Sequence, residues 1–243
     1  MAVHAILADI HGNLAALQAV LRAVDARGCD AAYCLGDIVG YGASPNECVE
    51  LMIARGMRCI MGNHDAAVVG RLDTSGLSWE ASEAVLWTRV VLTADHFAFL
   101  LHLPDRILVG SRALLVHGTP EECDRTILGR RDLFDHVRRL RRFSGLEICF
   151  FGHTHIPLLA SDNRVHLGVT EPLPLDGPGP YMINPGSVGQ PRDGNPCAAF
   201  ALWDDGARTV TFVRVPYDIA SSQQAIRRWG LPSSLAERLE VGV

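Results

Sequence analysis

Short apolar runs that end abruptly in acidic, histidine or asparagine side chains recur along this chain. The first run, Val3 to Ala8, is followed at once by Asp9, Ile10 and His11. A short apolar run is typical of a buried strand, and residues two apart in an extended chain point the same way. We therefore expect Asp9 and His11 to project together from the carboxyl end of a strand, where ligands of open α/β sheets bind. For this pair alone, an N-cap aspartate beside a structural histidine is the alternative.

Helical patterns separate the apolar runs. Asn13 is the expected cap of the first helix, and Ser44 to Glu47 is interpreted as a capping box that opens the second. This alternation predicts a parallel sheet covered by helices. Strands are expected at 3–8, 31–35, 57–61, 107–109, 113–116, 147–151, 181–183, 198–203 and 209–215, and helices at 13–27, 45–55, 78–92, 93–102, 130–142, 219–229 and 233–239.

The 243 residues are 48% apolar and 20% charged, a composition typical of a globular chain. No linker or repeat divides them, so a single domain over 1–243 is expected. A net charge of −5 without a basic tail argues against strong nucleic-acid binding. Seven cysteines without a CxxC motif favour free thiols in a cytoplasmic protein. No apolar run reaches the roughly 18 residues that a membrane span needs.

Side chains that bind divalent metal ions follow five of the expected strands. Four of the five clusters contain a histidine, and their shared placement at strand ends is hard to explain by packing. One six-coordinate ion does not need so many donors, whereas two ions about 3.5–4 Å apart that share one carboxylate fit well. Histidine with aspartate suits manganese, iron, zinc or cobalt rather than calcium. Such a pair attracts an anion and supports in-line displacement at phosphorus. The donors are Asp9, His11, Asp37, Asn63, His117, His153 and His155.

The sequence blocks around these donors follow one another in the order Asp9–His11, Gly36–Asp37, Gly62–Asp65, His117 and Gly152–His155. They resemble the pattern DxH, GDx, GNH(D/E), H and GHxH of the calcineurin-like metallophosphoesterases. Asn184 to Val188 resembles a segment of the small bacterial phosphodiesterase-type members and extends the match over most of the chain. The resemblance implies an α/β fold, a four-layer α/β/β/α sandwich of two mixed sheets flanked by helices. It also implies that the later short strands supply much of the second sheet.

The same resemblance implies two divalent transition-metal ions, with manganese expected and iron, zinc, cobalt or nickel as alternatives. Asp37 would bridge the ions, and a hydroxide between them would attack phosphorus in line. His64 would bind no metal and would act at the leaving group as general acid or transition-state donor, with Asp65 orienting its imidazole. The first ion would be held by Asp9, His11 and His155, and the second by Asn63, His117 and His153.

Departures from the family pattern bear on the substrate. Protein Ser/Thr phosphatases and the diadenosine tetraphosphatase relatives carry a phosphate-binding arginine after the GD block, and Tyr41 stands in that place here. This difference disfavours a phosphoprotein phosphatase or a dinucleoside polyphosphate hydrolase and favours a small phosphodiester, with nucleotides among the candidates. Arg192 is interpreted as a substitute clamp or an ordinary surface arginine. Tyr41 and Asn13 are candidates for lining the pocket, with a turn role for Asn13 as an equal alternative.

A non-catalytic scaffold with the same fold is the alternative from another class of function. Scaffold members of the family tend to lose ligand histidines, and none is missing from this sequence. Residues 70–103 either form a lid over the pocket or simply pack as covering helices.

Overall fold

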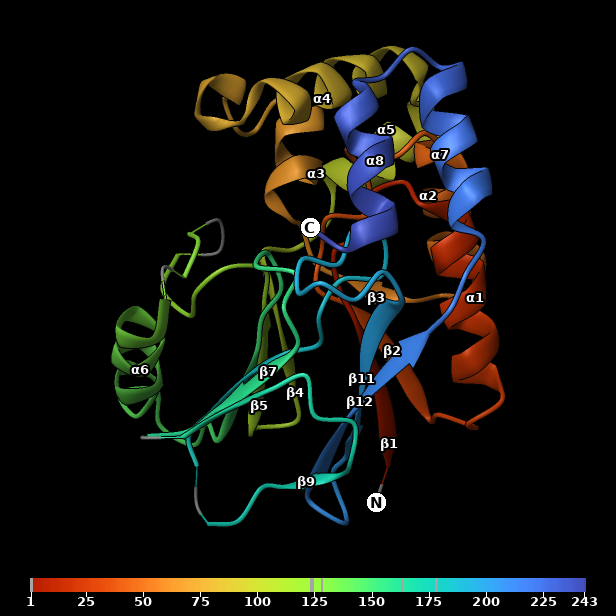
Figure 1. Cartoon of the computed structure of the whole chain (residues 1–243). Coiled ribbons are helices and arrows are strands. Elements are labelled where there is room, and N and C mark those ends of the chain that lie inside the picture. Colours follow the sequence, from red (N-terminus) through yellow and green to blue (C-terminus); the bar gives the residue numbers. More distant parts are fainter. Residues whose placement is uncertain (1, 123–124, 128, 163, 178) are drawn as a thin grey trace.

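Two six-stranded mixed sheets pack face to face between layers of helices, which confirms the expected four-layer sandwich (Figure 1). This computed structural model describes residues 2–122, 125–127, 129–162, 164–177 and 179–243. The strands of the first sheet lie in the order β3 (Arg58–Cys59), β2 (Ala31–Cys34), β1 (Val3–Leu7), β11 (Ala198–Asp204), β12 (Thr209–Val215) and β9 (Leu173–Pro174). The strands of the second sheet lie in the order β4 (Arg106–Val109), β5 (Ala113–Val116), β6 (Ile148–Phe150), β10 (Tyr181–Asn184), β7 (Leu158–Ala160) and β8 (Val165–Leu167).

Helices cover the outer faces of both sheets. The apolar sides of α1 (Leu14–Asp25) and α2 (Pro45–Ala54) pack on the first sheet, and α6 (Gly129–Leu140) packs on the second. Asn13 caps α1 as expected, because its Oδ1 accepts a hydrogen bond from the backbone N–H of Ala16 at 3.2 Å. The layer between the sheets is apolar, and its large members include Ile6, Leu115, Phe150, Ile183 and Phe212.

The remaining helices gather at one end of the sandwich, opposite the N-terminus (Figure 1). They are α3 (Asn63–Val68), the 3₁₀ turn η1 (Thr74–Gly76), α4 (Trp79–Val91), α5 (Ala94–Leu101), α7 (Ile219–Arg228) and α8 (Ser233–Val241). β1, β2 and β3 run parallel to one another, as do β5, β6 and β10. Their carboxyl ends therefore meet beneath these helices.

The sheet pairing and one helix cap differ in detail from the expectation. β7, β8 and β10 supply the second sheet, but β11 and β12 complete the first, because β11 pairs antiparallel with the edge of β1 that β2 leaves free. Pro45 begins α2, yet the side chain of Ser44 makes no cap hydrogen bond, so the predicted capping box is wrong. The backbone N–H of Ser44 instead donates to the carbonyl of Gly12 at 3.0 Å, and Glu47 is exposed.

Two sequence-based expectations concern thiols and membrane spans. The described cysteines form no disulfide with one another, and Cys123 lies outside the described residues. Among the helices of the described ranges, none combines the length and the apolar character needed to cross a membrane.

Candidate metal centre

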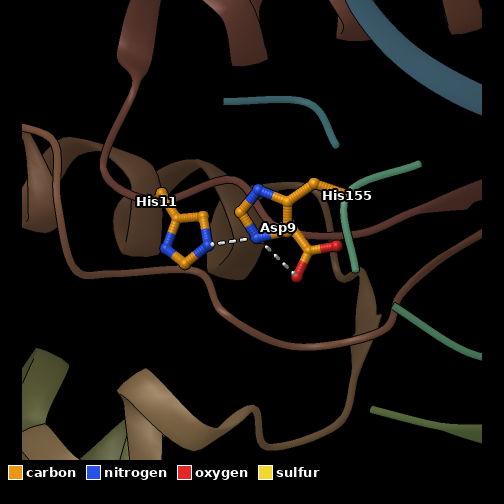
Figure 2. Close-up of side chains that lie close together, drawn as sticks. All are labelled: Asp9, His11 and His155. Carbon is orange, nitrogen blue, oxygen red and sulfur yellow. Dashed lines mark hydrogen bonds and ion pairs between the residues drawn. The ribbon is translucent and has the colours of Figure 1, made fainter. Parts of the chain in front are cut away.

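Asp9, His11 and His155 come together just beyond the carboxyl ends of β1 and β6 (Figure 2). Nε2 of His11 lies 3.1 Å from Nε2 of His155, which lies 3.6 Å from Oδ1 of Asp9. Nδ1 of His11 donates to the carbonyl of Val39 at 3.2 Å, and Nδ1 of His155 donates to that of Gln190 at 2.6 Å. These hydrogen bonds leave two Nε2 lone pairs facing each other, an arrangement that a bound cation relieves.

A second group of donors comes from the ends of β3, β5 and β6. Oδ1 of Asn63 lies 2.7 Å from Nδ1 of His153 and 3.0 Å from Nε2 of His117. The two histidine nitrogens are 3.2 Å apart. Nδ1 of His117 donates to the carbonyl of Leu35 at 2.7 Å, and Nε2 of His153 is hydrogen-bonded to Oγ1 of Thr126. Both rings therefore turn their remaining nitrogen toward Asn63.

Asp37 lies between the two groups. Its Oδ2 is 3.6 Å from Nε2 of His11 and 3.3 Å from Nε2 of His117. Its Oδ1 accepts a hydrogen bond from the backbone N–H of His64 at 2.8 Å. Ligands about 2.1 Å from one transition-metal ion lie about 3 Å from each other. Both groups fit that geometry, so the site could hold two divalent ions with Asp37 beside each.

Left-handed backbone, rather than strand geometry, directs most of these donors. β1 ends at Leu7, so the predicted alternation of Asp9 and His11 along an extended strand is wrong, although the two side chains do meet. Such backbone costs about 1–3 kcal/mol per non-glycine residue and collects at functional sites. The donors concerned are Asp9 (φ +55°), His11 (φ +49°), Asp37 (φ +54°), His153 (φ +66°) and His155 (φ +60°).

Two motif glycines allow the chain to pass close to the carboxylates. A Cβ on Gly62 would overlap Oδ1 of Asp37, and one on Gly152 would lie 3.1 Å from Oδ2 of Asp9. The glycine that precedes Asn63 is therefore needed at its position, and the one that precedes His153 avoids a tight contact with the carboxylate of Asp9.

Burial and neighbouring charges set the protonation of the donors. Burial lowers the pKa of His11 and His155 well below the ordinary value, and that of His153 to about 3. Burial also raises the pKa of Asp9 to about 7. Neutral imidazoles are the form that binds metal ions, so three of the four histidines are ready to do so.

His64 and Asp65 lie at the start of α3, but they do not contact each other as predicted. The carboxylate of Asp65 accepts hydrogen bonds from the backbone N–H groups of Ile38, Val39 and Gly62 at 3.0–3.1 Å. Nδ1 of His64 is buried and has no hydrogen-bond partner among the residues that the structure describes. The predicted orienting role of Asp65 is therefore wrong, and its carboxylate ties the loop after β2 to the start of α3.

An open cleft of about 490 Å³ lies above the donors, and both His64 and Arg192 line it. Tyr41 lines it as well, with its ring 4.4 Å from that of His64. Residues 72–81 form part of the wall, so some of the 70–103 segment does border the pocket. Asn13 is not among the cleft residues, and its Nδ2 donates to the carbonyl of Gly189 at 2.8 Å. Asn13 also caps α1, and it lines a separate cavity of about 190 Å³ together with His11 and Tyr41.

The residues that orient the histidines lie outside the sequence motifs. Val39, Leu35 and Gln190 act through backbone carbonyls, which no side-chain pattern marks. Thr126 lies in a segment without a recognised motif. Gln190 lies two residues after the Asn184–Val188 block, and this proximity is the sequence feature that could have indicated its role.

The model of the calcineurin-like phosphoesterase superfamily domain matches residues 2–205 of this chain. The chain therefore belongs to this superfamily, as its motifs indicated, and the family is one of metal-dependent phosphoesterases. An uncharacterized protein of Methanocaldococcus jannaschii is 38% identical over 243 residues, which cover 98% of this chain and 97% of the relative.

Solved structures agree with this assignment. A metallophosphoesterase from Sphaerobacter thermophilus is 39% identical, with 99% of this chain and 100% of that chain covered and a TM-score of 0.85. A hypothetical protein from Pyrococcus horikoshii OT3 is 22% identical, with 100% and 99% covered and a TM-score of 0.82, and it shares the fold.

Proposed function

We propose that this protein is a two-metal phosphodiesterase that hydrolyses small phosphate diesters. The main support is Asp37, whose Oδ2 lies within 3.6 Å of one histidine of each donor group at an open cleft. Two divalent ions bound there, with manganese expected, would activate water and neutralise charge on the phosphoryl oxygens. The proposed ligands are Asp9, His11, Asp37, Asn63, His117, His153 and His155.

Arg192 is the proposed binding group for the substrate phosphate. Its guanidinium carbon lies 5.7 Å from the centre of the Tyr41 ring, and its Nη2 donates to the Tyr41 hydroxyl at 3.3 Å. No carboxylate of the described residues pairs with it, and its buried Nε has no hydrogen-bond partner. A guanidinium has five N–H donors, and one that lines the cleft without a carboxylate partner is well suited to bind a phosphate oxygen.

His64 is the proposed donor to the leaving group. A Cβ on Gly40 would lie 2.5 Å from its Nδ1, so Nδ1 faces the backbone and Nε2 is the nitrogen that faces the cleft. A hydrogen bond or proton from Nε2 would stabilise the alkoxide that departs from phosphorus.

The charge of the cleft favours a diester over a polyphosphate. Among its described lining residues Arg192 is the single guanidinium, and Asp73 adds a carboxylate. A diester carries one negative charge per phosphate, whereas a dinucleoside polyphosphate carries several and needs more cationic side chains. Leu72, Leu77 and Ile127 give the walls apolar surface against which the organic groups of a diester can pack.

Hydrolysis of bis-p-nitrophenyl phosphate with added manganese tests the proposal. We expect this diester to be cleaved faster than p-nitrophenyl phosphate or a diadenosine polyphosphate, and Asp37→Asn to lower kcat/KM by at least about 10²-fold. Equal rates for wild type and Asp37→Asn would contradict the proposal, and cleavage of the polyphosphate alone would reassign the substrate. Metal analysis after purification without chelators distinguishes a hydrolase, which should retain ions, from a scaffold.

A further inference from the structure

Arg192 is held by one buried amide that it shares with a second arginine. Gln190 is 2% exposed, and its Oε1 accepts a hydrogen bond from Nη2 of Arg192 at 2.8 Å. The same oxygen accepts a hydrogen bond from Nη1 of Arg238 at 3.4 Å. Arg238 lies on α8, so the C-terminal helix contacts the group that holds the proposed phosphate-binding arginine.

The backbone of Gln190 is fixed independently of its side chain. Its carbonyl accepts the hydrogen bond from Nδ1 of His155 at 2.6 Å, and its N–H donates to Oγ of Ser187 at 2.7 Å. These bonds hold the main chain beside the metal ligands but do not involve the side-chain amide. Among the described residues, Arg192 and Arg238 donate to Oε1 and so favour its direction.

α8 docks on the same loop at a second point. The carbonyl of Gly242, at the end of α8, accepts a hydrogen bond from the N–H of Gly194 at 2.9 Å. Gly242 has φ +68°, and a Cβ there would lie 2.7 Å from the carbonyl carbon of Asn195. The buried face of α8, which includes Leu235 and Leu239, packs in one apolar cluster with residues of α4 and α7. The helix is therefore a firm support for the loop.

We propose that Gln190 and Arg238 are positioning residues that hold the guanidinium of Arg192 toward the cleft, and that α8 thereby sets the affinity for the substrate phosphate. This inference rests on the proposed function. Gln190 and Tyr41 both accept from Nη2, and a guanidinium carries five N–H donors, so others remain for a phosphate oxygen. A free arginine side chain loses much rotamer freedom on binding, so a preorganised one binds more tightly. Arg238 lies beyond residues 2–205, the part that matches the family model.

A double-mutant cycle on the metal-loaded full chain tests the inference. We expect Arg238→Ala to raise KM for bis-p-nitrophenyl phosphate, and Ki for inorganic phosphate, by about three- to tenfold, with kcat changed less than about twofold. In the Arg192→Ala background, Arg238→Ala should have no further effect, because Arg238 acts through Arg192. Arg228→Ala on α7 removes the same charge from an exposed position and should leave both constants unchanged.

Metal content and thermal unfolding are measured for every variant. If Arg238→Ala lowers either, Arg238→Met keeps the aliphatic stem and replaces it in the cycle. The inference would be overturned if Arg238→Ala and Arg228→Ala changed KM and Ki equally, or if Arg238→Ala had its full effect in the Arg192→Ala background. Either result would leave the proposed function standing. Unchanged KM and Ki in Arg192→Ala would overturn the phosphate-binding role of Arg192 and the inference together.

Discussion

Nε2 of His117 lies 3.3 Å from Oδ2 of Asp37, and both side chains are almost completely buried. Burial lowers the pKa of His117, but the carboxylates of Asp37 and Asp9 outweigh it and raise that pKa to about 10. In the metal-free protein His117 therefore carries a proton at neutral pH. Protonation of this ring and binding of a cation by its Nε2 exclude each other.

Metal uptake should consequently release protons. Between pH 7 and 9 we expect about one proton to leave His117 as the second group of donors binds manganese, with affinity rising up to about tenfold per pH unit. Calorimetric titration of metal-free protein in buffers of different ionisation enthalpy measures this proton count. His117→Asn should lower it by about one. Binding heats at pH 8 that do not depend on the buffer would contradict the prediction.

Replacing His64 should separate turnover from metal binding. One nitrogen of His64 lies within 4.8 Å of the donor atoms of His11 and Asp37, so geometry alone also permits a ligand role. If His64 acts at the leaving group, His64→Ala should retain its metal ions and lose about 10²- to 10⁴-fold in kcat. Metal content measured by mass spectrometry alongside activity decides the matter. A parallel loss of ions and activity would make His64 a ligand.

Replacing Asp65 should affect stability rather than catalysis directly. Its carboxylate accepts three buried backbone N–H groups, and each one left without an acceptor costs about 1–3 kcal/mol. Asp65→Ala should therefore lower the free energy of unfolding by about 3 kcal/mol or more, measured in urea. Asp95→Ala, at an exposed acid on α5, is the control. A variant of normal stability that has lost only kcat would restore the role first predicted for Asp65.

The donors were predictable because each follows a short apolar run directly. His117 and His153 come one and three residues after β5 and β6, and a buried run that stops at a histidine is visible in the sequence. The role of Asp65 was not predictable from its place beside His64. Consecutive residues on a helix do not face each other, so adjacency in the motif indicates no contact.

Long-range backbone partners were equally hidden. Nδ1 of His117 and its acceptor in Leu35 are 82 residues apart, and His155 and Gln190 are 35 apart. Any residue type presents a carbonyl, so only the assembled sheets show which one lies in reach. The same limit applies to Arg238, whose helix carries no motif and contacts the site only through tertiary packing.

Adding one methyl group at Gly40 should disturb His64 selectively. A Cβ there would lie 2.5 Å from Nδ1 of His64, and Gly40 has φ +92°. Gly40→Ala should displace the imidazole and lower kcat at least about tenfold while the metal ions remain bound. Gly56→Ala is the matched control, because Gly56 has φ +56° with nothing within 4 Å of the added carbon. Both variants should lose about 1–2 kcal/mol of stability, because alanine is strained at a positive φ. Unchanged kcat in Gly40→Ala would contradict the packing argument.

Glu147 should give the fold an acid-sensitive contribution far from the metal centre. Its carboxylate accepts hydrogen bonds from Arg112 at 2.9 and 2.7 Å and from Arg208 at 3.0 Å. These hydrogen bonds, first that from Arg112, hold the pKa of Glu147 below its usual 4.5. A lowered folded-state pKa means that the stabilisation is complete above pH 4.5 and disappears as pH falls through the folded-state value.

Glu147→Gln should therefore lower the free energy of unfolding of the metal-free protein by about 1 kcal/mol at pH 7, because the partners are partly exposed. The difference from wild type should shrink as the pH falls below 4. Urea denaturation at pH 7 and at a pH below 4 measures this difference in the free energy of unfolding. Glu50→Gln, at an exposed position on α2, is the control. A difference that stays constant with pH would mean that Glu147 acts through packing or neutral hydrogen bonds, since only loss of the ionised carboxylate follows its titration.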